Sequence, residues 1–549
     1  MPINFSNSQY LILAAGRINY LNLPVNTNSS NSMIPINGKP VIAWILENLM
    51  KKKPDHVYIV TRRDDLHLNS FLNRAFSNKL NLTIIALDKT DSIVDSLKCG
   101  LENVDLHSPV NILLGDTLIA DELPDSPDSI FVHEVEDSSR WCLTTFDNNG
   151  NILDFIDKQP NRHGTLHAAC GFYCLADTDL LFRNAADAQL AEERQLSDVL
   201  NRYKSQRSLQ IIMANQWFDF GNIDNLIKAK QQLLQSRYFN TLTINPLLNT
   251  ITKVSEFDKK LRNELNWYEE IPERLMALIP RIVSKQEHNG KLHMVQEYYG
   301  YPNLAELYLY SDMSVENWHS VMKKLLLIHS EFLQHTTEVK KEDYHDVYQN
   351  KTFERLEALS EDQFWKELLK KDEVYINGIC YKNLPLLQKS IIEQCNKLVE
   401  NATSSLIHGD FCLSNILYDI NSQITKLIDP RGSFGSRGIY GDPRYDMAKL
   451  RHSIAGNYDF IVSDLFKVTV ARDQFQYEIY VNDNSKEIAN LLDEMLTESG
   501  YSINEIKFIE SLLFISMLPL HKDKPERQKM MFIEGIKLMN EIFNSDIRG

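Results

Sequence analysis

The chain has 549 residues, 43% of them hydrophobic and 24% charged, and a formal net charge of −16. Because one hydrophobic core rarely serves so many residues, this composition predicts a globular protein of two domains. The negative charge argues against a general binder of nucleic acid, since such binders need clustered Lys and Arg against many phosphates.

The first residues, MPINFSNSQYLILAAG, have no basic region before their short apolar run. No apolar stretch approaches the ~18 residues that a membrane span requires. The seven cysteines form no CxxC pair, which predicts reduced thiols rather than a disulfide framework. We therefore expect a cytoplasmic protein without membrane insertion, and the sequence leaves a homo-oligomer open.

Residues 10 to about 230 alternate short apolar runs with helix-like segments. The predicted strands are YLILAAG (10–16), HVYIVTR (56–62), LTIIALD (82–88) and VNILLGD (110–116), and a helix is predicted over 40–53. Such alternation predicts an α/β fold with a mostly parallel, Rossmann-like sheet. Ligands of these sheets bind beyond the carboxyl ends of the strands. The residues after the strands, Gly16, Arg17, Asp88 and Asp116, are therefore the first candidates for a site.

From about residue 240 the pattern becomes mainly helical, as in EFDKKLRNELNWYEEI and ENWHSVMKKLLLIHSEFLQHT. Strand-like segments interrupt it at HMVQEYYG (293–300) and near 406–430. We place one domain at 1–238 and the other, of α+β class, at 239–549.

The segment LIHGDFCLSNILYD (406–419) breaks an apolar run with His-Gly-Asp and resumes around an Asn. The flanking apolar pairs can fix a loop that leaves Asp410 and Asn415 at its open edge. A second acid, Asp429, follows the apolar run of ITKLIDPRG. Phosphoryl transfer requires a carboxylate that accepts a hydroxyl proton, and an amide and a second carboxylate that hold Mg²⁺ against ATP.

This segment, together with LIDPRG and GDPRYDMAKL (441–450), resembles the aminoglycoside phosphotransferase and choline kinase family, which has a protein-kinase-like fold. The resemblance implies Asp410 as catalytic base, with Asn415 and Asp429 as Mg²⁺ ligands. It also implies nucleotide-binding roles for Lys253 on a strand, Glu264 as its helical partner, and Glu297 in a hinge segment that receives adenine. Asp446 is expected to support the loop.

The N-terminal half carries a second set of signals. In LILAAG, the small residues Ala14, Ala15 and Gly16 let backbone amides approach a nucleotide, and Lys39 of GKP can reach its phosphates. Transfer of a nucleotidyl group brings two polyanions together, so Mg²⁺ between paired carboxylates must offset their repulsion. Asp116 and Asp219 are the candidate ligands.

With DKQP, ACGFY and EERQLSDVL, this set resembles the sugar-phosphate nucleotidyltransferases over about 220 residues. The resemblance implies that Lys39 and Lys158 act on phosphates and that Gly171 and Glu193 contact the sugar. Arg17 and Ser92 join the expected nucleotide-binding set. Members of the family usually read LAAGxGxR, whereas this chain has Ile18 and Tyr20 at the last Gly and Arg positions and Asn31 at a usually basic position.

The two resemblances together predict a bifunctional enzyme. It would phosphorylate a sugar or amino alcohol with ATP, then join the product to a nucleotide from a second NTP, for a cell-surface polysaccharide precursor. The choline kinase resemblance slightly favours CTP. One alternative is a kinase whose N-terminal domain only senses a nucleotide or sugar phosphate, and another is an assembly protein without catalysis.

Overall fold

A computed structural model gives the structure of the chain and describes residues 9–17, 30–124, 126–136, 138–158, 165–221, 223–233, 240–255, 258–436 and 438–545. The chain divides into two compact units, Met1–Leu233 with Tyr310–Asp312 and Leu234–Leu309 with Met313–Gly549. We call them the N-terminal and the C-terminal unit. The expected boundary between residues 238 and 239 lies outside the described residues and stays a prediction.

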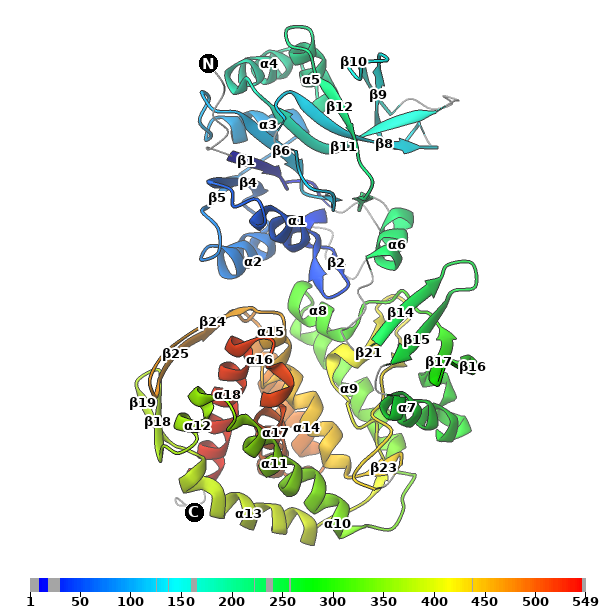
Figure 1. The fold of residues 1–549 in the computed structure, drawn as a ribbon, viewed down its shortest axis with the longest axis vertical. Helices are drawn as coiled ribbons and strands as arrows, with labels where there is room; N and C mark the ends of the chain where they lie inside the picture. The colour runs from blue at the N-terminus through cyan, green and yellow to red at the C-terminus, as the bar shows by residue number, and fades with distance from the viewer. Residues whose placement is uncertain are drawn as a thin grey trace. The chain divides into compact units, whose positions relative to one another are not determined.

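The N-terminal unit is built on a sheet whose strands run in the order β10-β9-β11-β6-β1-β4-β5, with β8 beside β11 and β12 beside β8 (Figure 1). Strands β6, β1, β4 and β5 are parallel neighbours, and β11 joins β6 in antiparallel fashion. The expected α/β fold with a mostly parallel sheet is confirmed for this unit. Its elements are β1 (Gln9–Leu13), η1 (Asn31–Met33), β2 (Pro35–Ile36), β3 (Lys39–Pro40), α1 (Val41–Met50), β4 (His56–Arg62), α2 (Leu66–Phe76), β5 (Leu82–Leu87), α3 (Ile93–Leu101), β6 (Val110–Leu114), β7 (Thr117–Ile119), β8 (Ser129–Val135), β9 (Cys142–Phe146), β10 (Ile152–Asp157), β11 (Leu166–Leu175), α4 (Thr178–Leu190), α5 (Leu196–Lys204), β12 (Gln210–Met213), β13 (Trp217–Asp219) and α6 (Ile223–Gln232).

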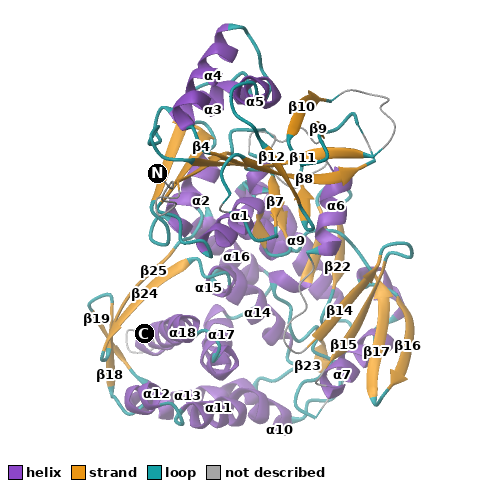
Figure 2. Cartoon of the chain, turned by 45° about the horizontal axis from the view of Figure 1, so that its top comes forward, coloured by secondary structure: helices purple, strands orange, loops and turns teal. Residues whose placement is uncertain are grey.

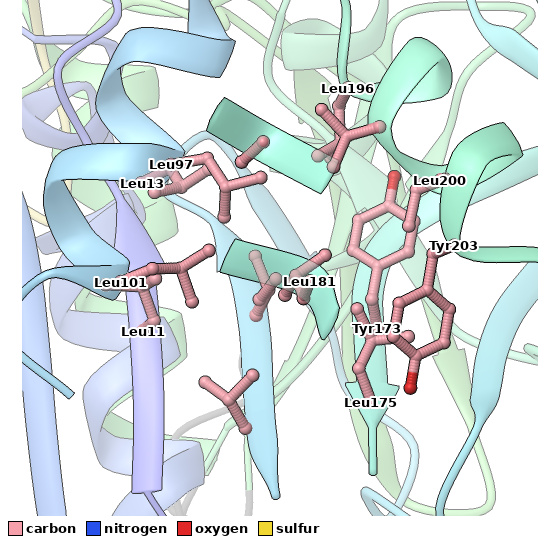
Figure 3. Packing of buried hydrophobic residues seen from close by; sticks show 14 of the residues in the cluster. Leu11, Leu13, Leu97, Leu101, Tyr173, Leu175, Leu181, Leu196, Leu200 and Tyr203 are labelled. Atoms are coloured by element: carbon pink, nitrogen blue, oxygen red, sulfur yellow. The ribbon is translucent and has the colours of Figure 1, made fainter. Parts of the chain in front are cut away.

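A hydrophobic cluster on one face of this sheet holds the strands under their helices. Leu11 of β1 belongs to it together with Leu97 of α3, Leu181 of α4 and Tyr203 of α5 (Figure 3). The cluster draws α3 so close to β1 that a Cβ at Gly100 would lie 2.7 Å from Leu11 Cδ1. This packing fixes where β1 ends and where α3 begins, and both points border the site described below.

The remainder of the chain contains an antiparallel sheet, β14-β15-β17-β16, and a group of helices (Figure 2). Helix α7 shows why these elements form, because Leu261, Leu265 and Tyr268 lie on one face and are buried. The elements are β14 (Asn240–Asn245), β15 (Thr250–Ser255), α7 (Asp258–Glu270), η2 (Glu273–Leu278), β16 (Ile282–His288), β17 (Lys291–Glu297), α8 (Leu304–Tyr310), α9 (Val315–Phe332), α10 (Lys341–Tyr344), η3 (His345–Asn350), α11 (Lys351–Leu359), α12 (Gln363–Leu368), β18 (Glu373–Ile376), β19 (Ile379–Lys382), α13 (Leu384–Glu400), β20 (Ser405–Leu406), η4 (Leu413–Asn415), β21 (Ile416–Asp419), β22 (Ile424–Leu427), β23 (Tyr440–Gly441), α14 (Pro443–Ile454), α15 (Tyr458–Val462), β24 (Phe466–Ala471), β25 (Gln474–Ile479), α16 (Ser485–Glu498), α17 (Ile503–Met517), η5 (Leu518–His521) and α18 (Pro525–Ser545).

Two further features bear on the expectations above. All seven cysteines lie within the described residues, and no two of them form a disulfide bond. Across the described helices, none combines the length and apolar character needed to cross a bilayer. The protein-kinase-like fold expected for the C-terminal unit stays a prediction.

Candidate active sites

In the N-terminal unit, the segments that follow β1, β4 and β6 meet at the carboxyl edge of the sheet. The amide of Ala14 donates to Val60 O over 2.9 Å, and that of Gly115 donates to Leu13 O over 2.9 Å. A Cβ at Gly115 would lie 2.9 Å from Ala14 Cα, so glycine is required for this close approach.

The segments after β1, β5 and β6, with Arg62 at the end of β4, border a cavity of about 500 Å³. Six of the predicted residues line it, and they come from three separate segments of the chain. The lining residues are Leu13, Ala14, Ala15, Gly16, Arg17, Ser30, Asn31, Ser32, Arg62, Thr90, Asp91, Ser92, Ile93, Ser96, Leu114, Gly115 and Asp116. The sequence-predicted nucleotide-binding residues of this unit therefore lie together.

Asp116 and Asp219 are held beside each other by strand pairing. Asp219 ends β13 opposite Thr117 of β7, and the amide of Phe220 donates to Asp116 O over 3.0 Å. Asn31 Nδ2 donates to Asp116 Oδ2 (3.3 Å), and Trp141 Nε1 donates to Asp219 Oδ2 (3.1 Å). Burial and then the neighbouring Asp219 raise the pKa of Asp116. A divalent cation would relieve this repulsion, and paired carboxylates are a donor set that Mg²⁺ accepts.

Two arginines bring positive charge to the cavity. Arg62, which is only 5% exposed, donates to Ala15 O over 2.7 Å. Arg17 is exposed and pairs with Asp64 at 2.8 Å. Arg62 was not among the predicted residues, although it ends a predicted strand at the edge where ligands bind. Ile18 and Tyr20 lie outside the described residues.

Asp219 and Asp88 are not among the residues that line the cavity, and neither are four other predicted residues of this unit. Lys39 Nζ contacts Glu47 and lies 3.7 Å from the centroid of a Trp44 ring. Glu193 forms a two-pronged pair with Arg202 at 2.9 Å.

The other two predicted residues, Gly171 and Lys158, are connected to the cavity site through neighbouring residues. Gly171 lies at a bulge of β11 with φ +80°, where a Cβ would be 3.1 Å from the side chain of Leu114, a cavity residue. The amide of Lys158 donates to Trp141 O (3.3 Å), and Trp141 in turn binds Asp219.

In the C-terminal unit, a buried lysine joins two carboxylates. Lys253 on β15 lies 2.8 Å from Glu264 Oε2 on α7 and 2.6 Å from Asp429 Oδ1. Lys253 and Glu264 are 5% and 6% exposed. Burial alone would lower the pKa of Lys253, but Asp429 and Glu264 outweigh it and raise that pKa. The lysine therefore stays charged, and the three predicted residues form one network.

The loop that carries Asp410 is held by backbone and side-chain contacts. Asp446 on α14 accepts from the amides of His408 (2.7 Å) and Gly409 (2.8 Å). Asn415 Nδ2 donates to Asp410 O (3.0 Å) and Oδ2 (3.2 Å), which leaves its amide oxygen as a candidate cation ligand. Burial acts to raise the pKa of Asp410, but Lys449 outweighs it and lowers the pKa to about 2.

Asp429 lies next to this loop. The amide of Ile428 donates to Asn415 O (2.9 Å), and that of Arg431 donates to His408 O (2.9 Å). Asp429 itself adopts a left-handed φ of 55°, a strained backbone that is common at functional sites. The structure thus brings Asp410, Asn415 and Asp429 together, and their oxygens fit a magnesium ion.

Glu297, expected in a hinge, ends β17. Its carboxylate accepts from the Arg281 amide (3.1 Å) and from Tyr299 Oη (2.9 Å). Its side chain is therefore engaged locally, and its expected role toward adenine stays a prediction.

Comparison with known proteins bears on the N-terminal part of the chain. Residues 9–236 match the family model described as Nucleotidyl transferase. The chain is 23% identical over 230 residues to "Bifunctional protein GlmU" of Methanocaldococcus jannaschii, covering 41% of this chain and 54% of that protein. It is also 23% identical over 233 residues to "Glucose-1-phosphate thymidylyltransferase" of Neisseria gonorrhoeae, covering 40% of this chain and 80% of that protein. The chain thus spans about half the length of the GlmU relative.

Two solved structures are similar to the same part of the chain. CTP:phosphocholine cytidylyltransferase from Streptococcus pneumoniae matches with 15% identity and a TM-score of 0.35, over 42% of this chain and 100% of that chain. HddC from Yersinia pseudotuberculosis matches with 18% identity and a TM-score of 0.32, over 41% and 100%.

Proposed function

We propose, from the premise that residues 9–236 are a nucleotidyl transferase family domain, that this part of the chain transfers a nucleotidyl group from an NTP to a phosphorylated acceptor. The observation that carries the proposal is the cavity of about 500 Å³ between the loops after β1, β5 and β6, with Asp116 in its wall. The small side chains of Ala14, Ala15 and Gly16 let a triphosphate approach the backbone of this loop closely.

In the proposed reaction, an oxygen of the acceptor phosphate attacks the α-phosphorus of the NTP, and pyrophosphate leaves. Asp116 and Asp219 would hold a magnesium ion, which supplies positive charge between the two polyanions. Arg62 and Arg17 also line the cavity and add positive charge to it. The choline kinase resemblance of the C-terminal unit slightly favours CTP as this NTP.

A second activity, phosphorylation of a small hydroxyl compound by ATP, is proposed for the C-terminal unit. The network of Lys253, Glu264 and Asp429 favours it, because a buried charged lysine is suited to ATP phosphates. Asp410, ionised because its pKa is about 2, would accept the hydroxyl proton. Asn415 and Asp429 would hold magnesium, which neutralises the phosphates as they transfer.

The two proposed steps form a sequence, because the phosphorylated product of the kinase is the type of acceptor that a nucleotidyltransferase uses. Such activated compounds are precursors of cell-surface polysaccharides. An alternative is supported by Asn31, which stands where the family usually has a basic residue and binds Asp116. In that alternative the N-terminal unit senses a nucleotide or sugar phosphate and only the kinase reacts.

An assay that measures ADP and pyrophosphate separately tests both proposals. The full chain is incubated with Mg²⁺, ATP, one further NTP and a panel of sugars and amino alcohols. Asp116→Asn should abolish pyrophosphate release and leave ADP release intact, whereas Asp410→Asn should abolish ADP release. Pyrophosphate release by Asp410→Asn should return when the phosphorylated acceptor is supplied. Release of ADP without pyrophosphate for every NTP would favour the sensor. Release of neither product would contradict both activities.

A further inference from the structure

Four cationic side chains gather beside Asp410 in the C-terminal unit. Lys351 and Arg355 lie one turn apart on α11, Arg431 follows Asp429 in its loop, and Lys449 lies on α14. We call these four residues the basic cluster. Helix α17 packs against both α11 and α14, which fixes the helices that carry three of them (Figure 1).

Two members of the cluster, Lys449 and Arg431, contact the Asp410 loop at the proposed reaction centre. Lys449 Nζ lies 2.9 Å from Asp410 Oδ1. Arg431 Nη1 donates to Tyr445 Oη over 2.8 Å, and Tyr445 lies one turn before Lys449 on α14. The amide of Arg431 also donates to His408 O, two residues before Asp410.

The cluster carries more positive charge than its carboxylate neighbours offset. Within the described ranges, Lys449 is the one member with a carboxylate inside the 4.0 Å limit of an ion pair, and that carboxylate is Asp410. Arg355 donates to a neutral acceptor, Ser516 O, at 2.7 Å. Of the other acids near the loop, Asp429 pairs with Lys253, and Asp446 accepts from the amides of His408 and Gly409.

Lys351 shows the consequence of this imbalance most clearly. Burial, followed by the charges of Arg431, Arg355 and Lys449, lowers its pKa well below the ordinary value for lysine, and Asp410 counteracts this only in part. A bound anion would stabilise the charged forms of these groups and remove much of their mutual repulsion.

Three members of the cluster lie on different elements from the residues proposed to hold ATP, and the fourth, Arg431, shares the loop of Asp429. Lys253 and Glu264 come from β15 and α7, whereas Lys351, Arg355 and Lys449 come from α11 and α14. The hydroxyl that gives its proton to Asp410 must belong to the acceptor. An anionic group bound by the cluster would therefore be part of the acceptor rather than of ATP.

We propose that the basic cluster binds the anionic group of the phosphoryl acceptor, so that the acceptor is a hydroxy compound that carries a carboxylate or a phosphate rather than an amino alcohol. This proposal rests on the kinase function proposed above. In the reaction the acceptor hydroxyl gives its proton to Asp410 and its oxygen forms a bond to the γ-phosphorus of ATP. The bond from that phosphorus to the β–γ bridging oxygen breaks, and ADP leaves.

The test compares two series of acceptors that differ in charge and that, except for the shorter ethanolamine, share a carbon skeleton within each series. The full chain is assayed for ADP release, at fixed Mg-ATP, with glucuronate, glucose 6-phosphate, glucose and glucosamine, and with glycerate, glycerol 3-phosphate, glycerol and ethanolamine. We expect kcat/KM for an anionic member to exceed that of its neutral partner by about tenfold or more, the value of one charge-assisted hydrogen bond. The carboxylates and phosphates separate the two possible sources of the charge.

Substitution of the cluster ties this preference to its residues. Lys351→Met should raise KM for the anionic acceptor about tenfold or more and leave KM for ATP unchanged, and Lys351→Arg should restore most of the loss. The neutral partner should lose little, so the preference itself should shrink. Lys389→Met, at an exposed lysine on α13, is the matched control and should change neither constant.

Each other outcome overturns the proposal in a distinguishable way. A preference for glucosamine or ethanolamine, or an equal loss for charged and neutral acceptors in Lys351→Met, would refute the anionic acceptor and leave the kinase intact. A larger effect of Lys351→Met on KM for ATP than on KM for the acceptor would assign the cluster to the nucleotide. If no acceptor in the panel stimulates ADP release by the wild type, so that it behaves like Asp410→Asn, the kinase function is refuted together with this proposal.

Discussion

The Nζ atom of Lys449 lies 2.9 Å from Oδ1 of Asp410, and this pair governs the charge of the proposed base. Burial acts to raise the pKa of Asp410, but the ammonium outweighs it and lowers the pKa to about 2. Lys449→Met removes that ammonium, so we expect the pKa of Asp410 to rise by about 1–3 units, the usual effect of an adjacent opposite charge.

The measurement for this variant is the pH profile of kcat/KM for ADP release. A base must be ionised to accept a proton, so the variant should lose more of its rate at pH 5 than at pH 8. The wild type should keep its rate as the pH falls from 8 to 5. Lys323→Met, at an exposed lysine of α9, should keep the wild-type profile. A Lys449→Met profile with an unmoved acid limb would contradict this role.

Gly432 fixes the loop of Asp429 against helix α7. Its φ is +62°, and a Cβ there would lie 1.9 Å from the carbonyl oxygen of Asn263, the residue before Glu264. Gly432→Ala should lower the free energy of unfolding by about 3 kcal/mol or more, because either the loop or α7 must move. ADP release should fall as well, since the movement separates Glu264 and Asp429 from Lys253.

Urea unfolding followed by circular dichroism measures the stability of this variant. Gly378→Ala is the control, since Gly378 also has positive φ (+81°) but has open space around its Cβ position among the described residues. It should cost only about 1 kcal/mol, the cost of a left-handed alanine. Equal losses for the two variants would refute the close contact with α7.

The edge of the N-terminal sheet was predictable from sequence because parallel strands end at one edge. Each strand is a continuous apolar run, so its last residue marks the position of the loop that follows. Gly16 and Asp116 were found in this way, and both line the cavity. The same reasoning could have found Arg62, the last residue of β4, which was left out because it was counted as part of the strand.

Partners that are distant in sequence could not be predicted from spacing. Lys39 lies where a phosphate contact was expected, but the β2–β3 hairpin turns its side chain toward Glu47 and Trp44. Glu193 is engaged by Arg202, one helix further along the chain. Lys449 follows Asp410 by 39 positions, and only the packing of α14 under the loop brings the two together.

Asn31 offers a test of how the N-terminal cavity receives a triphosphate. Its Nδ2 donates to Asp116 Oδ2, and its Oδ1 is buried without a hydrogen-bond partner among the described residues. Asn31→Lys would add a cation to the cavity that already contains Arg62 and Arg17. We expect KM for the NTP in pyrophosphate release to fall about tenfold, as for one added charge-assisted hydrogen bond.

Asn31→Met separates the effect of charge from the loss of the hydrogen bond to Asp116. It should leave KM for the NTP unchanged or raise it, because it adds no cation. If Asn31→Lys binds the NTP no more tightly than Asn31→Met, the added ammonium does not reach the triphosphate. In that case the position is refuted as a phosphate contact in this chain.

Asp459 on α15 provides a pH-dependent test of stability in the C-terminal unit. It is buried, its Oδ2 has no hydrogen-bond partner in the part of the chain that the structure describes, and burial raises its pKa to about 7 despite a hydrogen bond from Ser453. A carboxyl whose pKa is raised on folding binds more protons when folded than when unfolded. Its stabilising contribution is therefore present below the unfolded pKa of 3.8 and is lost as the pH rises to about 7.

Asp459→Asn keeps the shape of the protonated acid and removes its titration. Between pH 5 and pH 8, the free energy of unfolding of the variant should rise relative to that of the wild type by about 2–3 kcal/mol, because the wild type must ionise a buried carboxyl. Urea unfolding of the full chain at both pH values measures this difference, and Asp483→Asn, at an exposed aspartate, should show none. A difference that stays constant with pH would mean that Asp459 is already ionised in the folded protein at pH 5, with its charge compensated by groups other than Ser453.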